Sequence, residues 1–145
     1  MSKYVEKTGR YNGFEYAVSV NPKMGFRCGY VAFPKDWKRK HNPKDCWDLP
    51  YSVHGGITYG RFGYPWKAKM ENYVAGFDCG HYGDGVDPTL IDPKVYGMTS
   101  EELNQYLTTS GFLKCAEGDH MWTTEEVEDE CKSLIDQIIA EGEAE

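Results

Sequence analysis

The sequence has no long hydrophobic run and no CxxC motif, and its five cysteines are an odd number spread far apart. A membrane-spanning helix needs about 18 or more consecutive apolar residues. Disulfide frameworks and zinc sites usually show closely spaced cysteine pairs. The first ten residues, MSKYVEKTGR, also lack the apolar stretch of a signal peptide. We therefore expect a soluble, cytoplasmic protein with no membrane association and no disulfide framework.

Basic residues are scarce, because 16 Lys and Arg face 23 Asp and Glu and the net charge is −7. The charge is unevenly distributed. Residues 1–75 carry 13 Lys and Arg against 6 Asp and Glu, whereas residues 76–145 carry 3 against 17. General nucleic-acid binding needs a concentrated positive surface, so we do not expect it. The asymmetry fits an acidic helix lying over a basic sheet, an acidic face for a basic partner, or simply a difference between solvated faces.

What the sequence does contain is enough apolar and aromatic material for one folded domain. Its 145 residues are 40% hydrophobic and 14% aromatic, and a chain of this length can bury a core without staples. We expect a single domain over residues 1–145, with a basic, strand-rich part at 1–95 and an acidic, helical part at 96–145.

Several short segments have the composition of β-strands. Residues 14–20 and 26–33 are rich in strand-forming residues and flank the turn sequence NPKMG, which predicts a hairpin. Residues 51–59 and 71–79 are predicted to be further strands, and the run of Gly, Asp and Pro at 80–93 predicts a loop.

Two helices are predicted in the C-terminal third. The first, at about 100–109, follows Thr99 and Ser100, which suit an N-cap. The second, at about 124–140, begins with a capping box formed by Thr123 and Glu126. Its apolar stripe at helical spacing consists of Val127, Cys131, Leu134, Ile135 and Ile138. The expected fold class is α+β, an antiparallel sheet from the N-terminal two-thirds with the two C-terminal helices packed on one face.

The segment 34–50 is a long, polar loop that contains Trp37 and Trp47 among several Lys and Arg residues. A basic loop with interleaved aromatics can hold a phosphate or nucleotide. The favoured interpretation is a solvated loop whose tryptophans attach it to the body of the protein.

Two segments, VHGGITYG at 53–60 and GFDCGHYGDGVDP at 76–88, indicate a site. Imidazoles and carboxylates are common metal ligands. The predicted set for a divalent metal is His54, Asp78, His81 and Asp84, with Cys79 as a thiolate substitute. Its spacing matches no strict metal signature. Without metal, the same groups suit acid–base chemistry, and Cys79 as a nucleophile is the least favoured alternative.

The same region also suits binding of a nucleotide-like ligand. Aromatic rings at Tyr59, Tyr64 and Trp66 can stack on a base, and Arg61 and Lys67 can meet phosphates. Ordinary packing around Gly and Pro turns is the alternative explanation for these rings. The predicted ligand-binding residues are His54, Gly55, Gly56, Tyr59, Arg61, Asp78, His81 and Tyr82.

Four blocks of the chain together resemble a family of small proteins found largely in bacteriophage and prophage genomes. The blocks read RCGYVAFPKDW, VHGGITY, GFDCGHYGD and EDECKSLIDQI. The similarity extends over about residues 24–88 and 122–138. The resemblance implies a phage origin and the cytoplasm of a bacterial host cell, but it assigns no catalytic residue. Small accessory phage proteins often inhibit host defence by binding a defence protein or its signalling nucleotide.

Three functions remain open at this point. The first is a phage-type anti-defence protein that binds a host defence protein or its nucleotide signal. The second is a metal-dependent hydrolase acting on a phosphate or nucleotide substrate, which would need the divalent metal site. The third is an assembly role in a phage particle. We place the first ahead of the second because an enzyme usually leaves a sharper sequence signature.

Overall fold

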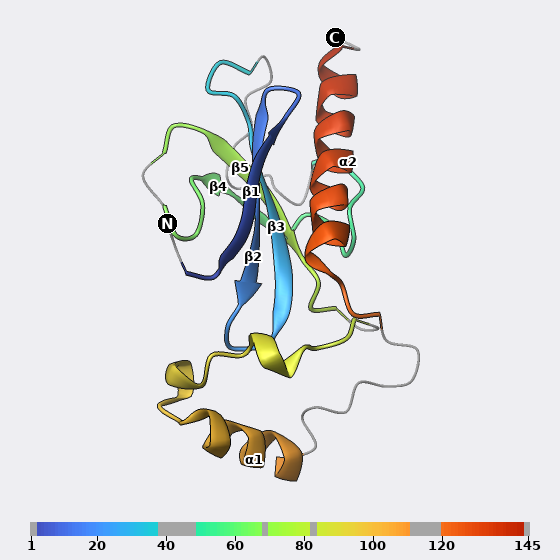
Figure 1. Cartoon of the computed structure of the whole chain (residues 1–145). Coiled ribbons are helices and arrows are strands. Elements are labelled where there is room, and N and C mark those ends of the chain that lie inside the picture. The colour runs from blue at the N-terminus through green and yellow to red at the C-terminus, as the bar shows by residue number, and fades with distance from the viewer. Residues whose placement is uncertain (1–2, 38–48, 68–69, 82–83, 111–119, 144–145) are drawn as a thin grey trace.

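The computed structural model describes residues 3–37, 49–67, 70–81, 84–110 and 120–143. A five-stranded antiparallel sheet has the strand order β1-β2-β3-β5-β4, and two 3₁₀ turns and two α-helices follow it (Figure 1). The elements are β1 Val5–Tyr11, β2 Phe14–Asn21, β3 Phe26–Ala32, β4 Tyr59–Phe62, β5 Tyr73–Asp78, η2 Pro88–Leu90, η3 Pro93–Tyr96, α1 Ser100–Ser110 and α2 Thr124–Glu143. Among the described residues, no helix has the length and apolarity to cross a membrane.

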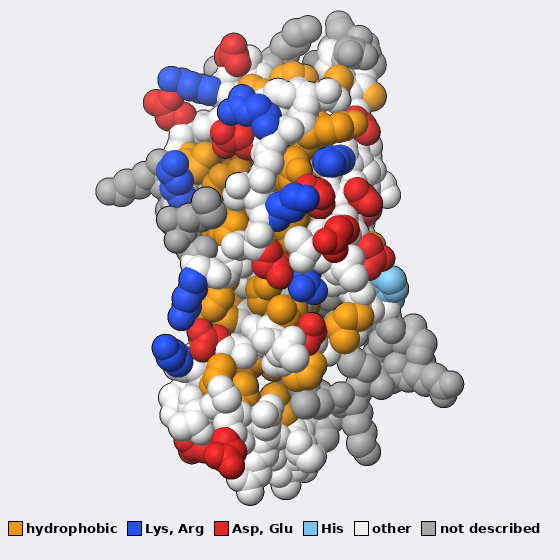
Figure 2. All heavy atoms as spheres, in the orientation of Figure 1, with side chains coloured by type: hydrophobic (Ala, Val, Ile, Leu, Met, Phe, Trp, Pro, Cys, Tyr) orange, Lys and Arg blue, Asp and Glu red, His pale blue; other side chains and the backbone are white. Residues whose placement is uncertain are grey.

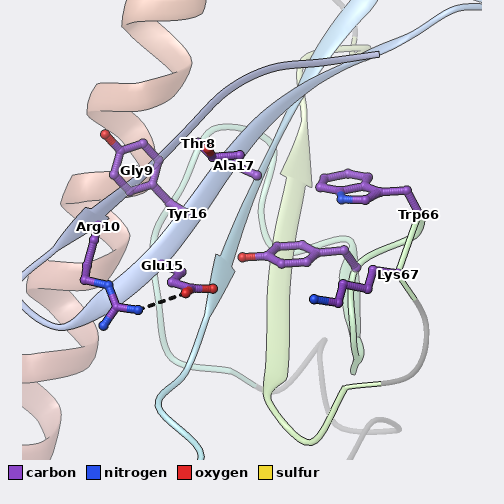
Figure 3. A pocket seen from close by; sticks show the side chains of 9 residues that line it. Thr8, Gly9, Arg10, Glu15, Tyr16, Ala17, Trp66 and Lys67 are labelled. Carbon is purple, nitrogen blue, oxygen red and sulfur yellow. Dashed lines mark hydrogen bonds and ion pairs between the residues drawn. The ribbon is translucent and has the colours of Figure 1, made fainter. Parts of the chain in front are cut away.

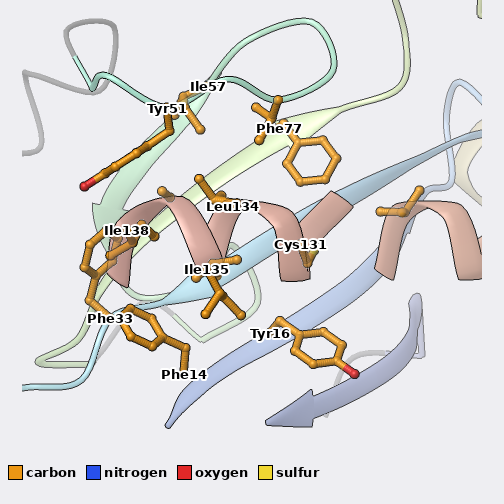
Figure 4. Packing of buried hydrophobic residues seen from close by; sticks show 14 of the residues in the cluster. Phe14, Tyr16, Phe33, Tyr51, Ile57, Phe77, Cys131, Leu134, Ile135 and Ile138 are labelled. Atoms are coloured by element: carbon orange, nitrogen blue, oxygen red, sulfur yellow. The ribbon is translucent and has the colours of Figure 1, made fainter. Parts of the chain in front are cut away.

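The α+β prediction is confirmed, and α2 is the helix that covers one face of the sheet (Figure 4). The five residues of the predicted apolar stripe are all fully buried in the main core. The capping box is confirmed as well, because Glu126 N–H donates to Thr123 Oγ1 at 3.2 Å and Thr123 N–H donates to Glu126 Oε1 at 3.0 Å. The carboxylates of the first turn also interact favourably with the positive, N-terminal end of the helix dipole.

Helix α1 has a different position, at the end of the molecule beyond the β2–β3 hairpin (Figure 1). Its buried residues Leu103 and Leu107 form a small separate core with Ile91, which follows η2. A second capping box starts this helix, because Glu102 N–H donates to Thr99 Oγ1 at 3.1 Å and Thr99 N–H donates back to Glu102 Oε1 at 3.1 Å.

The predicted strand at 51–59 is wrong except at its last residue, because β4 is Tyr59–Phe62. Residues 51–58 instead lie along α2. Side chains of this helix, rather than a neighbouring strand, form hydrogen bonds with the backbone of the segment. Ser52 N–H donates to Gln137 Oε1 at 2.7 Å, Gln137 Nε2 donates back to Ser52 O at 2.8 Å, and His54 N–H donates to Glu130 Oε1 at 2.7 Å. Burial against α2 explains why this segment alternates in the way that a strand does.

Strand β1 was not predicted from the sequence, and most of the long loop at 34–50 lies outside the described residues. β1 pairs with β2 along one side, and all its residues are at least partly exposed, so its polar sequence gave little strand signal. Residues 38–48 of the loop, including Trp47, lie outside the described residues. Trp37 packs edge-on against Phe14, with ring centroids 4.9 Å apart, so this tryptophan does attach the start of the loop to the core.

Candidate functional site

The two segments that indicated a site meet where β5 ends. Asp78 is the last residue of β5, and the chain that follows it brings Asp84 back to His54. The His54 Nε2 and Asp84 Oδ2 atoms are 2.8 Å apart. The rings of His54 and His81 lie 5.9 Å apart between their centroids. The fold therefore gathers the imidazole from the middle of the chain and the acidic turn downstream into one place.

Asp84 is the centre of this group, and three neighbouring groups already contact its carboxylate. Besides His54, its Oδ2 accepts the His81 backbone N–H at 2.9 Å, and its Oδ1 accepts the Trp122 indole N–H at 3.1 Å. Its side chain is 3% exposed. The His54 imidazole also lies against the Trp122 ring, with centroids 4.3 Å apart. We call Trp122 and the four predicted metal ligands His54, Asp78, His81 and Asp84 the histidine cluster.

The structure shows why the residue after His54 is a glycine, Gly55. It has a φ of +70°, and a Cβ at this position would lie 2.2 Å from the ring of His81. Only glycine allows both the left-handed backbone and this close approach. Gly56 also has a positive φ of +82°, but a Cβ there would meet open space. The backbone at the glycine pair is therefore approached by His81, rather than by the ligand that the sequence suggested.

His81 and Asp78 make a second pair in the cluster. His81 Nε2 lies 3.2 Å from Asp78 Oδ1, a distance without good hydrogen-bond geometry, and this nitrogen is buried. Asp78 is otherwise engaged by the Thr58 hydroxyl at 3.1 Å and the Gly80 backbone N–H at 3.0 Å. Both carboxylates of the cluster thus act as acceptors for local donors.

The predicted metal site does not form from these side chains as they lie. Within the part of the chain that the structure describes, no three His, Cys, Asp or Glu residues are arranged to hold a metal ion. Cys79 does not supply the missing ligand, because it is 2% exposed and burial raises the pKa of its thiol. A thiol protonated at neutral pH is a poor metal ligand and a poor nucleophile. The cluster therefore connects residues 51–58, residues 78–81, residues 84–85 and the start of α2 through polar contacts, and we call this connection a polar clamp.

The predicted ligand-binding residues are divided between two sides of the sheet. In β5, Ala75 and Phe77 point toward α2, while Val74 belongs to a second core on the opposite face. Tyr59 pairs with Gly76 and Arg61 pairs with Val74, so both lie on that opposite face. We call it the second face. Tyr82 lies outside the described residues. The eight predicted residues therefore do not line a single pocket.

A row of residues crosses the second face from one edge of the sheet to the other. The strand register places in this row Thr8, Ala17, Tyr30, Gly76 and Tyr59. A Cβ at Gly76 would lie 2.6 Å from Tyr30 Cδ1, so the glycine gives the Tyr30 ring room to lie across β5. There it meets Tyr59 edge-on, with centroids 5.2 Å apart. The second face thus has an aromatic floor.

A tight turn adds two more rings to this floor. Tyr64 and Lys67 exchange backbone hydrogen bonds of 3.1 and 3.0 Å, and Pro65 occupies the second turn position, which suits its fixed φ. The turn stacks Trp66 parallel to Tyr64, with ring centroids 5.0 Å apart and an interplanar angle of 5°. Trp66 also meets Tyr30 edge-on at 5.3 Å.

The turn and the β1–β2 hairpin flank an open hollow of about 710 Å³, which we call the aromatic hollow (Figure 3). Arg10 and Lys67 supply two cations and Glu15 one anion, and Arg10 donates to Glu15 Oε1 at 2.9 Å. The hollow is lined by Thr8, Gly9, Arg10, Glu15, Tyr16, Ala17, Tyr64, Trp66 and Lys67. Burial raises the pKa of the Tyr64 hydroxyl, so it stays protonated at neutral pH.

The sequence predicts only half of the aromatic hollow. Its composition marks the rings of Tyr64 and Trp66 and the cation of Lys67 as suitable for a nucleotide-like ligand. The other wall comes from β1 and β2, more than 40 residues away in the sequence. No local pattern marks Arg10 or Glu15, since only strand pairing brings them opposite the turn.

Comparison with known proteins adds no further assignment. The chain matches no family model, no curated protein and no solved structure.

Proposed function

We propose that this protein is a binding protein whose ligand is a nucleotide held in the aromatic hollow. The observation that carries the proposal is the hollow itself, in which the Tyr64–Trp66 stack adjoins Arg10 and Lys67. Its volume of about 710 Å³ falls within the range of roughly 300–1000 Å³ that is usual for small-molecule sites.

The chemistry of the lining suits a planar base attached to an anionic group. Stacking of a base on an aromatic side chain contributes about 1–3 kcal/mol and tolerates different bases. Lys67 is exposed, and the protonated hydroxyl of Tyr64, which lines the same hollow, can donate a hydrogen bond. A phosphate that approached Arg10 would compete with Glu15 for the guanidinium, and such exposed ion pairs are weak.

The distribution of charge supports the same side of the molecule for an anionic ligand. In Figure 2, Asp and Glu side chains gather on the α2 side, whereas the Lys and Arg side chains on the sheet side are interspersed with Asp and Glu. The first turn of α2 alone contributes Glu125 and Glu126. An anion is therefore repelled from the α2 side, while the aromatic hollow, with Arg10 and Lys67 against Glu15, carries a small excess of positive charge.

The resemblance to phage proteins supplies a biological setting for this binding. A phage protein that held a host defence system's signalling nucleotide would inhibit that system by sequestration, without any bond being broken. The hydrolase alternative would need a metal site, and the described residues do not form one. Nucleotide binding, in contrast, needs only the side chains that line the aromatic hollow.

Calorimetric titration with AMP, ADP, ATP and NAD tests the proposal. We expect at least one of them to bind with a stoichiometry of one per chain and to raise the melting temperature, since a ligand at 100 times its Kd stabilises by about 2.7 kcal/mol. Trp66→Ala removes a stacking surface and should weaken binding by roughly 5- to 150-fold, the equivalent of about 1–3 kcal/mol.

Phe62→Ala is the matched control, because Phe62 is an aromatic residue, 47% exposed, that packs on Tyr73 away from the hollow. It should leave the affinity unchanged. Absence of binding across the whole panel, or equal loss in both variants, would contradict a nucleotide site in the aromatic hollow.

A further inference from the structure

The β1–β2 hairpin places both of the charged side chains that it contributes to the aromatic hollow in one row of the sheet. Arg10 pairs with Glu15 across these two strands, and Glu15 pairs with Ala32 of β3. Residues directly opposite one another on paired strands point to the same face, and Ala32 belongs to the core of the second face. The Arg10–Glu15 row therefore lies on the second face, next to the row that holds Thr8 and Ala17.

The Arg10–Glu15 pair is accessible to a ligand. Arg10 Nη2 donates to Glu15 Oε1 at 2.9 Å, and the Glu15 side chain is 52% exposed (Figure 3). An ionised carboxylate offers about four lone-pair sites, so this bond leaves capacity for further donors. Burial, and after it the charge of Glu15, raises the pKa of the Tyr64 hydroxyl, so the carboxylate lies within electrostatic reach of the aromatic wall. The hollow thus has a carboxylate acceptor and a guanidinium donor side by side in its lining.

Guanine is the base whose hydrogen-bonding edge matches such a pair most fully. Its Watson–Crick edge presents the O6 acceptor, the N1–H donor and the N2 amino donor in that order. One carboxylate can accept from both adjacent donors while a neighbouring guanidinium N–H donates to O6. Adenine and cytosine each present a single donor group on this edge, so a carboxylate distinguishes guanine from both.

We propose that the aromatic hollow binds a guanine nucleotide and that Glu15 is the residue that selects the base. This inference rests on the proposed function, since it names the ligand class of the same site. Glu15 accepts from N1–H and the N2 amino group, and Arg10 donates to O6. The phosphate is directed to Lys67 on the wall formed by the turn, because the negative charge of Glu15 repels it from the hairpin.

The test is calorimetric titration of the wild-type chain with GMP, IMP, AMP and CMP. We expect GMP to bind roughly tenfold more tightly than AMP or CMP, which is within the discrimination that a bidentate contact to a base edge provides. IMP differs from GMP only in lacking the 2-amino group. It should therefore bind with an affinity between those of GMP and AMP.

Glu15→Gln tests the selecting residue, because it replaces the carboxylate with an amide of similar size whose NH₂ group opposes the guanine donors. It should weaken GMP binding roughly tenfold, leave AMP within about twofold, and remove the preference for GMP over IMP. Glu71→Gln is the matched control, since Glu71 is an exposed carboxylate that pairs with Lys35 and does not line the hollow. It removes the same charge and should keep the wild-type order of affinities.

Two results would overturn the guanine assignment and leave the nucleotide site in place. In the first, AMP binds and GMP binds no more tightly. In the second, Glu15→Gln weakens GMP, IMP and AMP equally, which would show that the carboxylate does not read the base. If GMP, IMP and CMP fail to bind along with AMP, ADP, ATP and NAD, the nucleotide site and the guanine assignment are both wrong.

Discussion

The histidine cluster and the aromatic hollow lie on different sides of the sheet and use their polar groups in different ways. In the histidine cluster, Asp84 accepts three hydrogen bonds and is 3% exposed. In the aromatic hollow, Lys67 is exposed, and the Arg10–Glu15 pair is accessible to solvent. The histidine cluster contains more side chains of reactive types, whereas the aromatic hollow has room for a ligand.

This difference shows why reactive residue types do not by themselves indicate a binding site. A buried carboxylate that already accepts three hydrogen bonds stabilises the fold and has little capacity left for a ligand. A site needs groups that the fold positions but leaves available. Four predictions test the contrast, beginning with the largest expected effect.

Asp84→Ala should cause the largest loss of stability. It leaves the donors of His54, Trp122 and the His81 backbone without their acceptor, and removal of one partner from such a buried group costs about 3 kcal/mol. Urea unfolding measures the change. Asp36→Ala, at an exposed position, is the control and should change stability by less than about 0.5 kcal/mol. Equal effects of the two variants would show that the cluster is not a clamp.

Gly55→Ala should rank second, and Gly56→Ala provides a matched comparison. Both residues have positive φ, which costs a residue with a Cβ about 1–2 kcal/mol. At Gly55 the new Cβ also collides with the His81 ring, so we expect about 2 kcal/mol or more, against about 1 kcal/mol at Gly56. Thermal unfolding distinguishes the two. If the losses are the same, His81 does not pack closely on Gly55 in solution.

Glu126→Gln should reduce the sensitivity of the protein to acid. The backbone N–H of Thr123 donates to the Glu126 carboxylate, and this bond, with a smaller contribution from His120, lowers the pKa of Glu126. A lowered pKa stabilises the fold above the unfolded-state pKa of about 4.3, and this contribution is lost as the pH falls through the folded-state pKa.

Urea midpoints at pH 7, 5 and 3 measure this effect. The wild-type midpoint should fall more steeply toward pH 3 than that of Glu126→Gln, whose amide still accepts the capping bond. Glu125→Gln, an exposed neighbour in the same turn, should follow the wild type. Parallel curves for all three proteins would refute the assignment of this acid sensitivity to the cap.

Arg10→Gln should have the smallest effect on stability, below about 0.5 kcal/mol, because its pair with Glu15 is exposed. On the proposed function it should nevertheless weaken nucleotide binding several-fold, since it removes a cation from the aromatic hollow. Calorimetric titration beside urea unfolding separates the two quantities. A stability loss as large as that of Asp84→Ala would remove the distinction between the two regions.

The sequence was sufficient to predict the elements whose pattern lies within a short stretch of the chain. The α2 stripe and its capping box lie within one helix, so side-chain periodicity and one turn of backbone geometry defined them. The hairpin formed by β2 and β3 was predicted for the same reason. β1 and the aligned segment 51–58 were missed or misassigned because their conformations depend on partners that are distant in the sequence.

The amino-acid sequence by itself determined the α+β composition and helix α2. It also gave the hypothesis that the segments 53–60 and 76–88, which are rich in His, Asp and Gly, lie together in the fold. Only the tertiary structure decided which of their side chains are hydrogen-bonded within the protein and which remain available to a ligand. The reason is that both the donors around a carboxylate and the walls of a hollow come from segments that are distant in the sequence. Trp122 bonds to Asp84 across 38 residues of sequence, and Arg10 and Trp66, which are distant in the sequence, line the same hollow.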